Sequence, residues 1–212
     1  MKKMVIRGLL LIFTIFACHE TTSDKIDFGS IENSVYRNEY FGLTLPIPFE
    51  WSVQDQETQK MFMDIGGEMI AGDDKNLKAL IKASELRVFK LLTILKYPLG
   101  EPVPFNPNII CIAEQVIHMP GIKNGKDCHF HGKRLLESSQ LEYSFPKEIY
   151  TEQIGGMDFD VMTMQISMVG QTIKQKSYVA VIKGYALGLI VSFTNEEEES
   201  EIDQVLGSLS FK

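Results

Sequence analysis

The stretch 157-MDFDVMTMQISMVGQTIKQKSYVAVIKGYALGLIVSF-193 decides the fold. It contains three long runs rich in apolar and β-branched residues, which only Val169-Gly170 and Lys183-Gly184 separate. Runs of this composition favour β-strands. Glycine in a two-residue connection supplies the positive φ that a tight hairpin needs. The stretch therefore predicts three consecutive antiparallel strands.

The sequence on either side extends this pattern. A fourth strand at 149–154 precedes the stretch and joins it through Gly155-Gly156, and a capped helix at 196–207 follows it. Further strands are expected at 35–36 and 40–45, with a polar turn at 37–39 between them, and at 51–53, 86–97, 108–117 and 209–211. Further helices are expected at 57–70, from 73 onward, and at 127–139. Groups of helices between runs of antiparallel strands are typical of the α+β class. We expect one mainly antiparallel sheet that helices cover on both faces.

Length and charge limit what the chain can do. Its 212 residues, 44% of them hydrophobic, suffice for one domain with a sizeable core and an extra segment. Three of the 21 basic residues, Lys2, Lys3 and Arg7, precede Cys18, where no acidic residue lies. The remainder has 18 basic and 28 acidic groups, a net charge of −10. Such a body lacks the basic excess that binds nucleic acid, so we expect no nucleic-acid partner.

The N-terminus is typical of a secretory signal peptide. A basic opening is followed by an apolar run at 8–17, and polar residues begin directly after Cys18. A membrane-spanning helix needs about 20 apolar residues, twice the length of this run. We therefore expect residues 1–17 to be a signal peptide that is removed.

Ile15-Phe16-Ala17-Cys18 resembles the lipobox of bacterial lipoproteins, although Phe16 is larger than the residues usual at its position. The resemblance implies that the Cys18 thiol receives a diacylglyceryl group and that Cys18 becomes the first residue. Stable attachment to a bilayer takes more than one acyl chain, which this modification supplies. We expect 18–34 to be a flexible tether, in which Ile26, Phe28 and Ile31 could pack on the body, and 35–212 to be the globular domain. We expect the body to lie outside the cytoplasm, anchored to a bacterial envelope membrane.

Two segments of the body resemble the PsbP-like family. The first is 36-YRNEYFGLTLPIPFEW-51, and the second is 184-GYALGLIVSF-193 with the acidic helix and closing strand that follow it. The resemblance implies an α/β/α sandwich with an antiparallel sheet, over about 36–212. It implies a binding face and no common catalytic residue, so function follows only weakly from it.

Cys111 and Cys128 are the two thiols of the body. An exported protein meets oxidising conditions, in which the two could form a disulfide. The alternative is that both stay free, because Cys111 lies within a strand that resembles buried core and Cys128 lies at the start of a helix. The sequence leaves both alternatives open.

His129 and His131, with His118 upstream, are the candidate metal ligands. Imidazole is a common metal ligand. Residues two apart on a helix point in very different directions, however, and no CxxC or HExxH motif accompanies these histidines. A solvated start of a helix is therefore the stronger interpretation, and we expect no cofactor.

Three functions are consistent with these features. The leading hypothesis is a membrane-anchored, non-enzymatic binding or assembly module whose partners are the bilayer, through the Cys18 acyl chains, and an unidentified envelope protein. The second is an immunity-type inhibitor of an exported toxin, since an acidic body complements a basic one. The third is a metal-binding or enzymatic envelope protein centred on 128–131.

Overall fold

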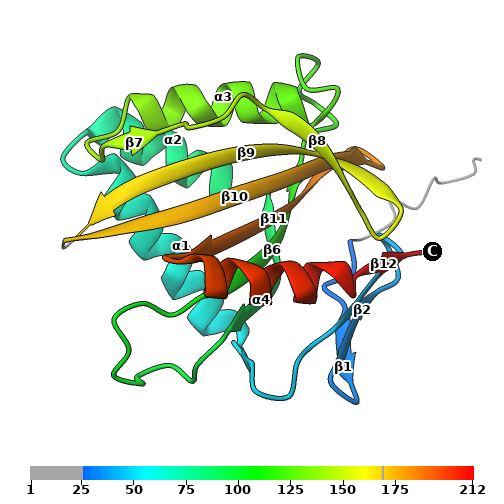
Figure 1. The fold of residues 1–212 in the computed structure, drawn as a ribbon. Coiled ribbons are helices and arrows are strands. Elements are labelled where there is room, and N and C mark those ends of the chain that lie inside the picture. The colour runs from blue at the N-terminus through cyan, green and yellow to red at the C-terminus, as the bar shows by residue number, and fades with distance from the viewer. Residues whose placement is uncertain (1–25, 169) are drawn as a thin grey trace, which may run out of the picture.

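The computed structural model describes residues 26–168 and 170–212, and the structural statements below concern these residues. They form an α+β fold with two antiparallel sheets (Figure 1). The large sheet has the order β4-β5-β6-β11-β10-β9-β7, with β8 also paired to β9, and the small sheet has the order β1-β2-β3-β12.

The bounds of the elements follow the chain. The strands are β1 (Ser30–Glu32), β2 (Val35–Asn38), β3 (Leu43–Pro46), β4 (Ser52–Val53), β5 (Val88–Leu95), β6 (Asn108–Gln115), β7 (Tyr143–Ser144), β8 (Tyr150–Ile154), β9 (Met157–Met168), β10 (Gln171–Ile182), β11 (Tyr185–Phe193) and β12 (Ser210–Phe211). The helices are α1 (Gln56–Ala71), α2 (Lys75–Glu85), α3 (Gly125–Glu137) and α4 (Glu196–Gly207).

The meander expected from the sequence is confirmed. β8, β9, β10 and β11 pair in antiparallel order through short turns. The turn between β10 and β11 places Lys183 at φ 48° and Gly184 at φ 79°, the left-handed conformation that a two-residue hairpin turn requires. These hairpins form the centre and one side of the large sheet.

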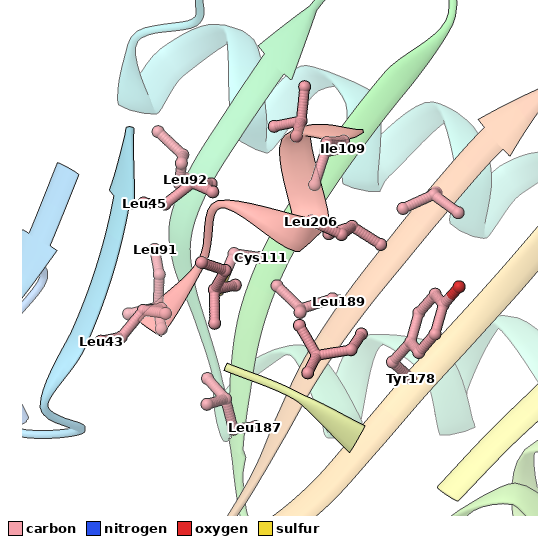
Figure 2. Packing of buried hydrophobic residues seen from close by; sticks show 14 of the residues in the cluster. Leu43, Leu45, Leu91, Leu92, Ile109, Cys111, Tyr178, Leu187, Leu189 and Leu206 are labelled. Carbon is pink, nitrogen blue, oxygen red and sulfur yellow. The ribbon is translucent and has the colours of Figure 1, made fainter. Parts of the chain in front are cut away.

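The main core lies between the large sheet and a layer made of α4 and the small sheet. Figure 2 shows Leu206 of α4 above Cys111 and Leu189, which belong to neighbouring strands of the large sheet. Helices α1 and α2 pack on β5, and α3 packs on β9 and β10, on the opposite face (Figure 1). The expected sandwich with helices on both faces is confirmed, and the small sheet is an addition to it.

The body begins earlier than residue 35. Ser30–Glu32 forms β1 and pairs with β2, and the ring of Phe28 lies 6.0 Å from that of Phe89. The Tyr36 hydroxyl donates a hydrogen bond to the Phe28 carbonyl at 2.8 Å. Within the expected tether of 18–34, residues 26–34 thus pack on the body, as the sequence allowed for Ile26, Phe28 and Ile31. The expected signal peptide at 1–17, the lipidation site Cys18 and residues 19–25 lie outside the described residues.

Side-chain caps define the helix starts. The Asn195 side chain accepts from the Glu198 amide, as expected. Helix α3 begins at Gly125, two residues earlier than expected, because Asn124 and Asp127 cap each other's backbone amides reciprocally. That earlier start brings the first turn of α3 down onto the large sheet.

Candidate binding cleft

Both thiols of the body are free. Cys111 of β6 is buried in the core beneath α4, whereas Cys128 belongs to α3 on the other face of the sheet. The large sheet therefore lies between the two thiols, and they form no disulfide in this structure. Burial raises the pKa of Cys111 to about 12 and that of Cys128 to about 11. Both remain thiols at neutral pH, so neither is an activated nucleophile.

The three histidines do not form a metal site. His129 is buried, and its Nε2 lies 2.9 Å from the Asp160 carbonyl oxygen, to which it donates a hydrogen bond. His118 and His131 are exposed. Within residues 26–168 and 170–212, no group of three or more His, Cys, Asp or Glu side chains is arranged to hold a metal ion. The hypothesis of a metal centre at 128–131 therefore gains no support from the geometry.

His129 instead gives the fold a pH dependence. Burial lowers the pKa of His129 below its ordinary 6.5 and outweighs the opposite influence of the Asp160 backbone and carboxylate. The unfolded chain then binds more protons than the folded one, so stability falls as pH drops below 6.5. Between pH 7 and pH 5, the free energy of unfolding of the wild type should fall, because the imidazole takes up a proton more readily in the unfolded chain. His129→Gln should show a shallower fall, and the two slopes should differ by at most about 1.4 kcal/mol per pH unit.

Urea unfolding at a series of pH values measures this slope. His131→Gln in the same helix is the matched control, since it leaves the buried imidazole in place. An unchanged slope in His129→Gln, or an equal reduction in both variants, would contradict the assignment.

The feature best suited to binding is a cleft of about 370 Å³ between the two sheets. β1 is the edge strand of the small sheet and β4 is the edge strand of the large one, and both border this cleft. Tyr36, Leu91 and Leu92 lie at its floor and are buried. The cleft thus exists because the small sheet packs over one end of the large sheet and leaves an opening between their edges.

Exposed apolar side chains surround the opening. Phe28 is 46% exposed, Ile31 43% and Val53 41%, and all three line the cleft. An apolar patch next to a hollow is typical of an interaction site, whereas single exposed apolar residues are ordinary. Phe28 and Ile31 belong to one segment at the start of the body, and packing brings Val53 of β4 beside them.

Three glutamines form the polar part of the wall. Gln59 is buried, and its Nε2 donates to the Gln54 carbonyl at 3.0 Å. Its Oε1 has no hydrogen-bond partner among the residues that the structure describes. The Gln56 Nε2 donates to the Lys90 carbonyl at 3.2 Å and covers part of the β5 edge. The Gln59 Oε1 has almost no accessible surface, so this unpaired acceptor is a cost in free energy within the wall of the cleft.

A second hollow, of about 450 Å³, lies between the proline-rich loop before β6 and the start of α4. Glu198 is the acidic residue in its lining. The Glu198 carboxylate already accepts hydrogen bonds from the Thr194 amide at 2.7 Å and from the Thr194 hydroxyl at 2.9 Å. Among the described residues that line this second hollow, no large apolar side chain is as exposed as Phe28, Ile31 and Val53 are at the first cleft. We therefore take the first cleft as the candidate site.

One indication of this site is present in the sequence. Ile26, Phe28 and Ile31 stand out as large apolar residues in a segment that is otherwise polar. The contribution of Val53 and of the glutamines at the start of α1 had no such indication, because it depends on contacts between distant parts of the chain.

Comparisons with known proteins agree with the fold. No known protein family and no curated protein matches the sequence. The solution structure of cyanobacterial PsbP (CyanoP) from Synechocystis sp. PCC 6803 matches with a TM-score of 0.50 and 12% identity, over 87% of this chain and 98% of that one. The body therefore has a PsbP-like fold, as the resemblance of its two ends implied.

Two more distant structures are also similar. LpqN of Mycobacterium tuberculosis, involved in cell envelope biogenesis, has a TM-score of 0.45 and 15% identity, over 80% of this chain and 83% of that one. A protein of unknown function from Pseudomonas aeruginosa, a putative regulator, has a TM-score of 0.41 and 15% identity, over 59% and 81%. Among the described residues, no helix combines the length and apolar character needed to cross a membrane.

Proposed function

We propose that this protein is an exported lipoprotein whose PsbP-like body binds another protein of the cell envelope without catalysing a reaction. The observation that carries the proposal is the apolar rim of the cleft, in which Phe28 and Ile31 of one segment and Val53 of another are exposed together. The signal-peptide pattern before Cys18 and its lipobox-like end support the anchored location.

The anchor is tested by acylation. We expect the wild-type protein to incorporate labelled palmitate and to enter the detergent phase on Triton X-114 partitioning. Cys18→Ala should incorporate none, because the thiol that accepts the diacylglyceryl group is absent. An intact mass that still includes residues 1–17 in the wild-type protein would contradict the proposed processing.

The binding function is tested by crosslinking in intact cells, followed by capture of the protein and identification of what it carries. We expect a defined envelope protein to be recovered with the wild type and to be depleted with Cys18→Ala. Recovery of a basic toxin would instead favour the inhibitor, which the net charge of the body also supports. Turnover of a substrate by the purified body would overturn the non-enzymatic proposal.

A further inference from the structure

We propose that the cleft holds an extended apolar segment of the partner protein, flanked by Lys or Arg, which adds to the small sheet as a strand beside β1. This inference rests on the proposed protein-binding function and specifies its mode. Addition of a strand to a sheet edge is a recurring way in which proteins bind peptides.

The backbone of β1 is free to pair in this way. β1 and β2 are joined through Asn33 and Ser34, at φ 50° and 58°, so Glu32 and Val35 close a two-residue turn as a hydrogen-bonded pair. Hydrogen-bonded and non-hydrogen-bonded pairs alternate in antiparallel strands. Ile31, opposite Tyr36, therefore directs its N–H and C=O away from β2, toward the free edge of the small sheet.

The side chains of the cleft suit an apolar strand. A strand beside β1 would present every second side chain to the floor formed by Leu91 and Leu92 and to the rim formed by Phe28 and Val53. Alternating apolar residues would thus be covered on one face, and polar residues would remain in water on the other.

The charge around the cleft indicates basic flanks. The lining residues and their direct neighbours in sequence contain four carboxylates, Asp27, Glu32, Asp55 and Glu57, and three basic residues, Arg37, Lys60 and Lys90, a slight acidic excess on a body whose net charge is −10. The residues that precede the body in its own chain, 19-HETTSDK-25, contain no large apolar side chain. They do not match an apolar cleft, which favours a segment from another protein as the occupant.

A displayed library of random twelve-residue peptides, selected against the purified body that begins at residue 19, tests this inference. We expect the enriched peptides to alternate apolar and polar residues and to carry basic ends. Ile31→Glu and Val53→Glu should each weaken their binding at least tenfold, as for residues at the centre of an interface. Leu86→Glu is the matched control, since Leu86 is 87% exposed outside the cleft, and it should leave binding unchanged.

Backbone pairing has its own readout. In ¹⁵N spectra of the body with the best peptide, the Ile31 amide should show slowed hydrogen exchange, which a change in side-chain packing alone would not cause. The inference is overturned if no peptide is enriched, if the two cleft variants bind as well as Leu86→Glu, or if the Ile31 amide is unaffected. It is also overturned if the body binds phosphatidylcholine vesicles and Val53→Glu abolishes that binding, because the cleft would then contact lipid.

Failure of this inference and failure of the proposed function can be told apart. An envelope partner that crosslinks equally well to wild type, Ile31→Glu and Val53→Glu would leave the function standing and remove the cleft from it. Absence of any crosslinked partner would remove the function, whatever the peptide library returns.

Discussion

Phe159→Ala is expected to lower the free energy of unfolding by about 3–5 kcal/mol, a large part of the 5–15 kcal/mol typical of a domain. Phe159 of β9 has no exposed surface and belongs to the core cluster that includes Ile202 and Leu206 of α4. Its ring also lies 5.9 Å from that of Phe211 in β12. The substitution would therefore leave a cavity where the large sheet, α4 and the small sheet meet.

Urea unfolding followed by circular dichroism measures this effect. Phe130→Ala on α3 is the matched control, because the Phe130 ring is 57% exposed and its removal leaves no comparable cavity. We expect that control to change stability by less than about 0.5 kcal/mol, as is usual for surface substitutions. Similar losses in the two variants would show that the face between α4 and the large sheet is not the main core.

The strands of the large sheet could be predicted because their determinants are local. Gly155, Gly170 and Gly184 mark turns that need positive φ, and each turn separates runs whose composition favours strands. Strands β2, β3 and β12 overlap predicted strand segments, but β1 and the grouping of these strands into a second, small sheet could not be predicted, because β1 has only three residues and β12 comes from the opposite end of the body. Short strands such as these acquire order from their pairing with β2 and β3.

The candidate site was less accessible to sequence reasoning than the fold. The cysteines and histidines were candidate site residues because of their residue type. In the structure, however, a sheet separates Cys111 from Cys128, and His129 is buried against a backbone carbonyl. The cleft consists of ordinary residues whose significance is their exposure beside an opening. The exposure of Val53 depends on how the two sheets pack, so it cannot be predicted from the residues next to Val53 in the sequence.

The centre of the core and the cleft respond to different substitutions. The face beneath α4 contains the core cluster, and the cleft opens at the margin of that cluster, where Tyr36, Leu91 and Leu92 form its floor. Substitution of Phe159 should therefore lower stability with little effect on binding, and substitution of Val53 should weaken binding with little effect on stability. On the opposite face, α3 approaches β9 and β10 closely at its first residue, Gly125.

Gly125→Ala is expected to destabilise the protein by about 1–3 kcal/mol, as overpacking does in a tightly packed site. Gly125 is the first residue of α3 and is buried. A Cβ there would lie 2.9 Å from the Asp160 Cβ and closer still to the backbone carbonyl oxygen of Val179. Since a strand backbone cannot move aside as a flexible side chain can, the first turn of α3 would have to lift from the sheet and strain the hydrogen bond from Lys126 N to the Asp160 carboxylate.

Gly132→Ala in the same helix is the matched comparison, because the same substitution is expected there to have the opposite effect on stability. A Cβ at Gly132 would meet nothing within 4 Å, and alanine favours a helix interior over glycine by about 0.5–1 kcal/mol. We therefore expect this variant to be more stable than the wild type in urea unfolding, while Gly125→Ala is less stable. If both substitutions stabilised the protein, the start of α3 would have room for a side chain, and the close approach of this helix to β10 would not constrain the fold.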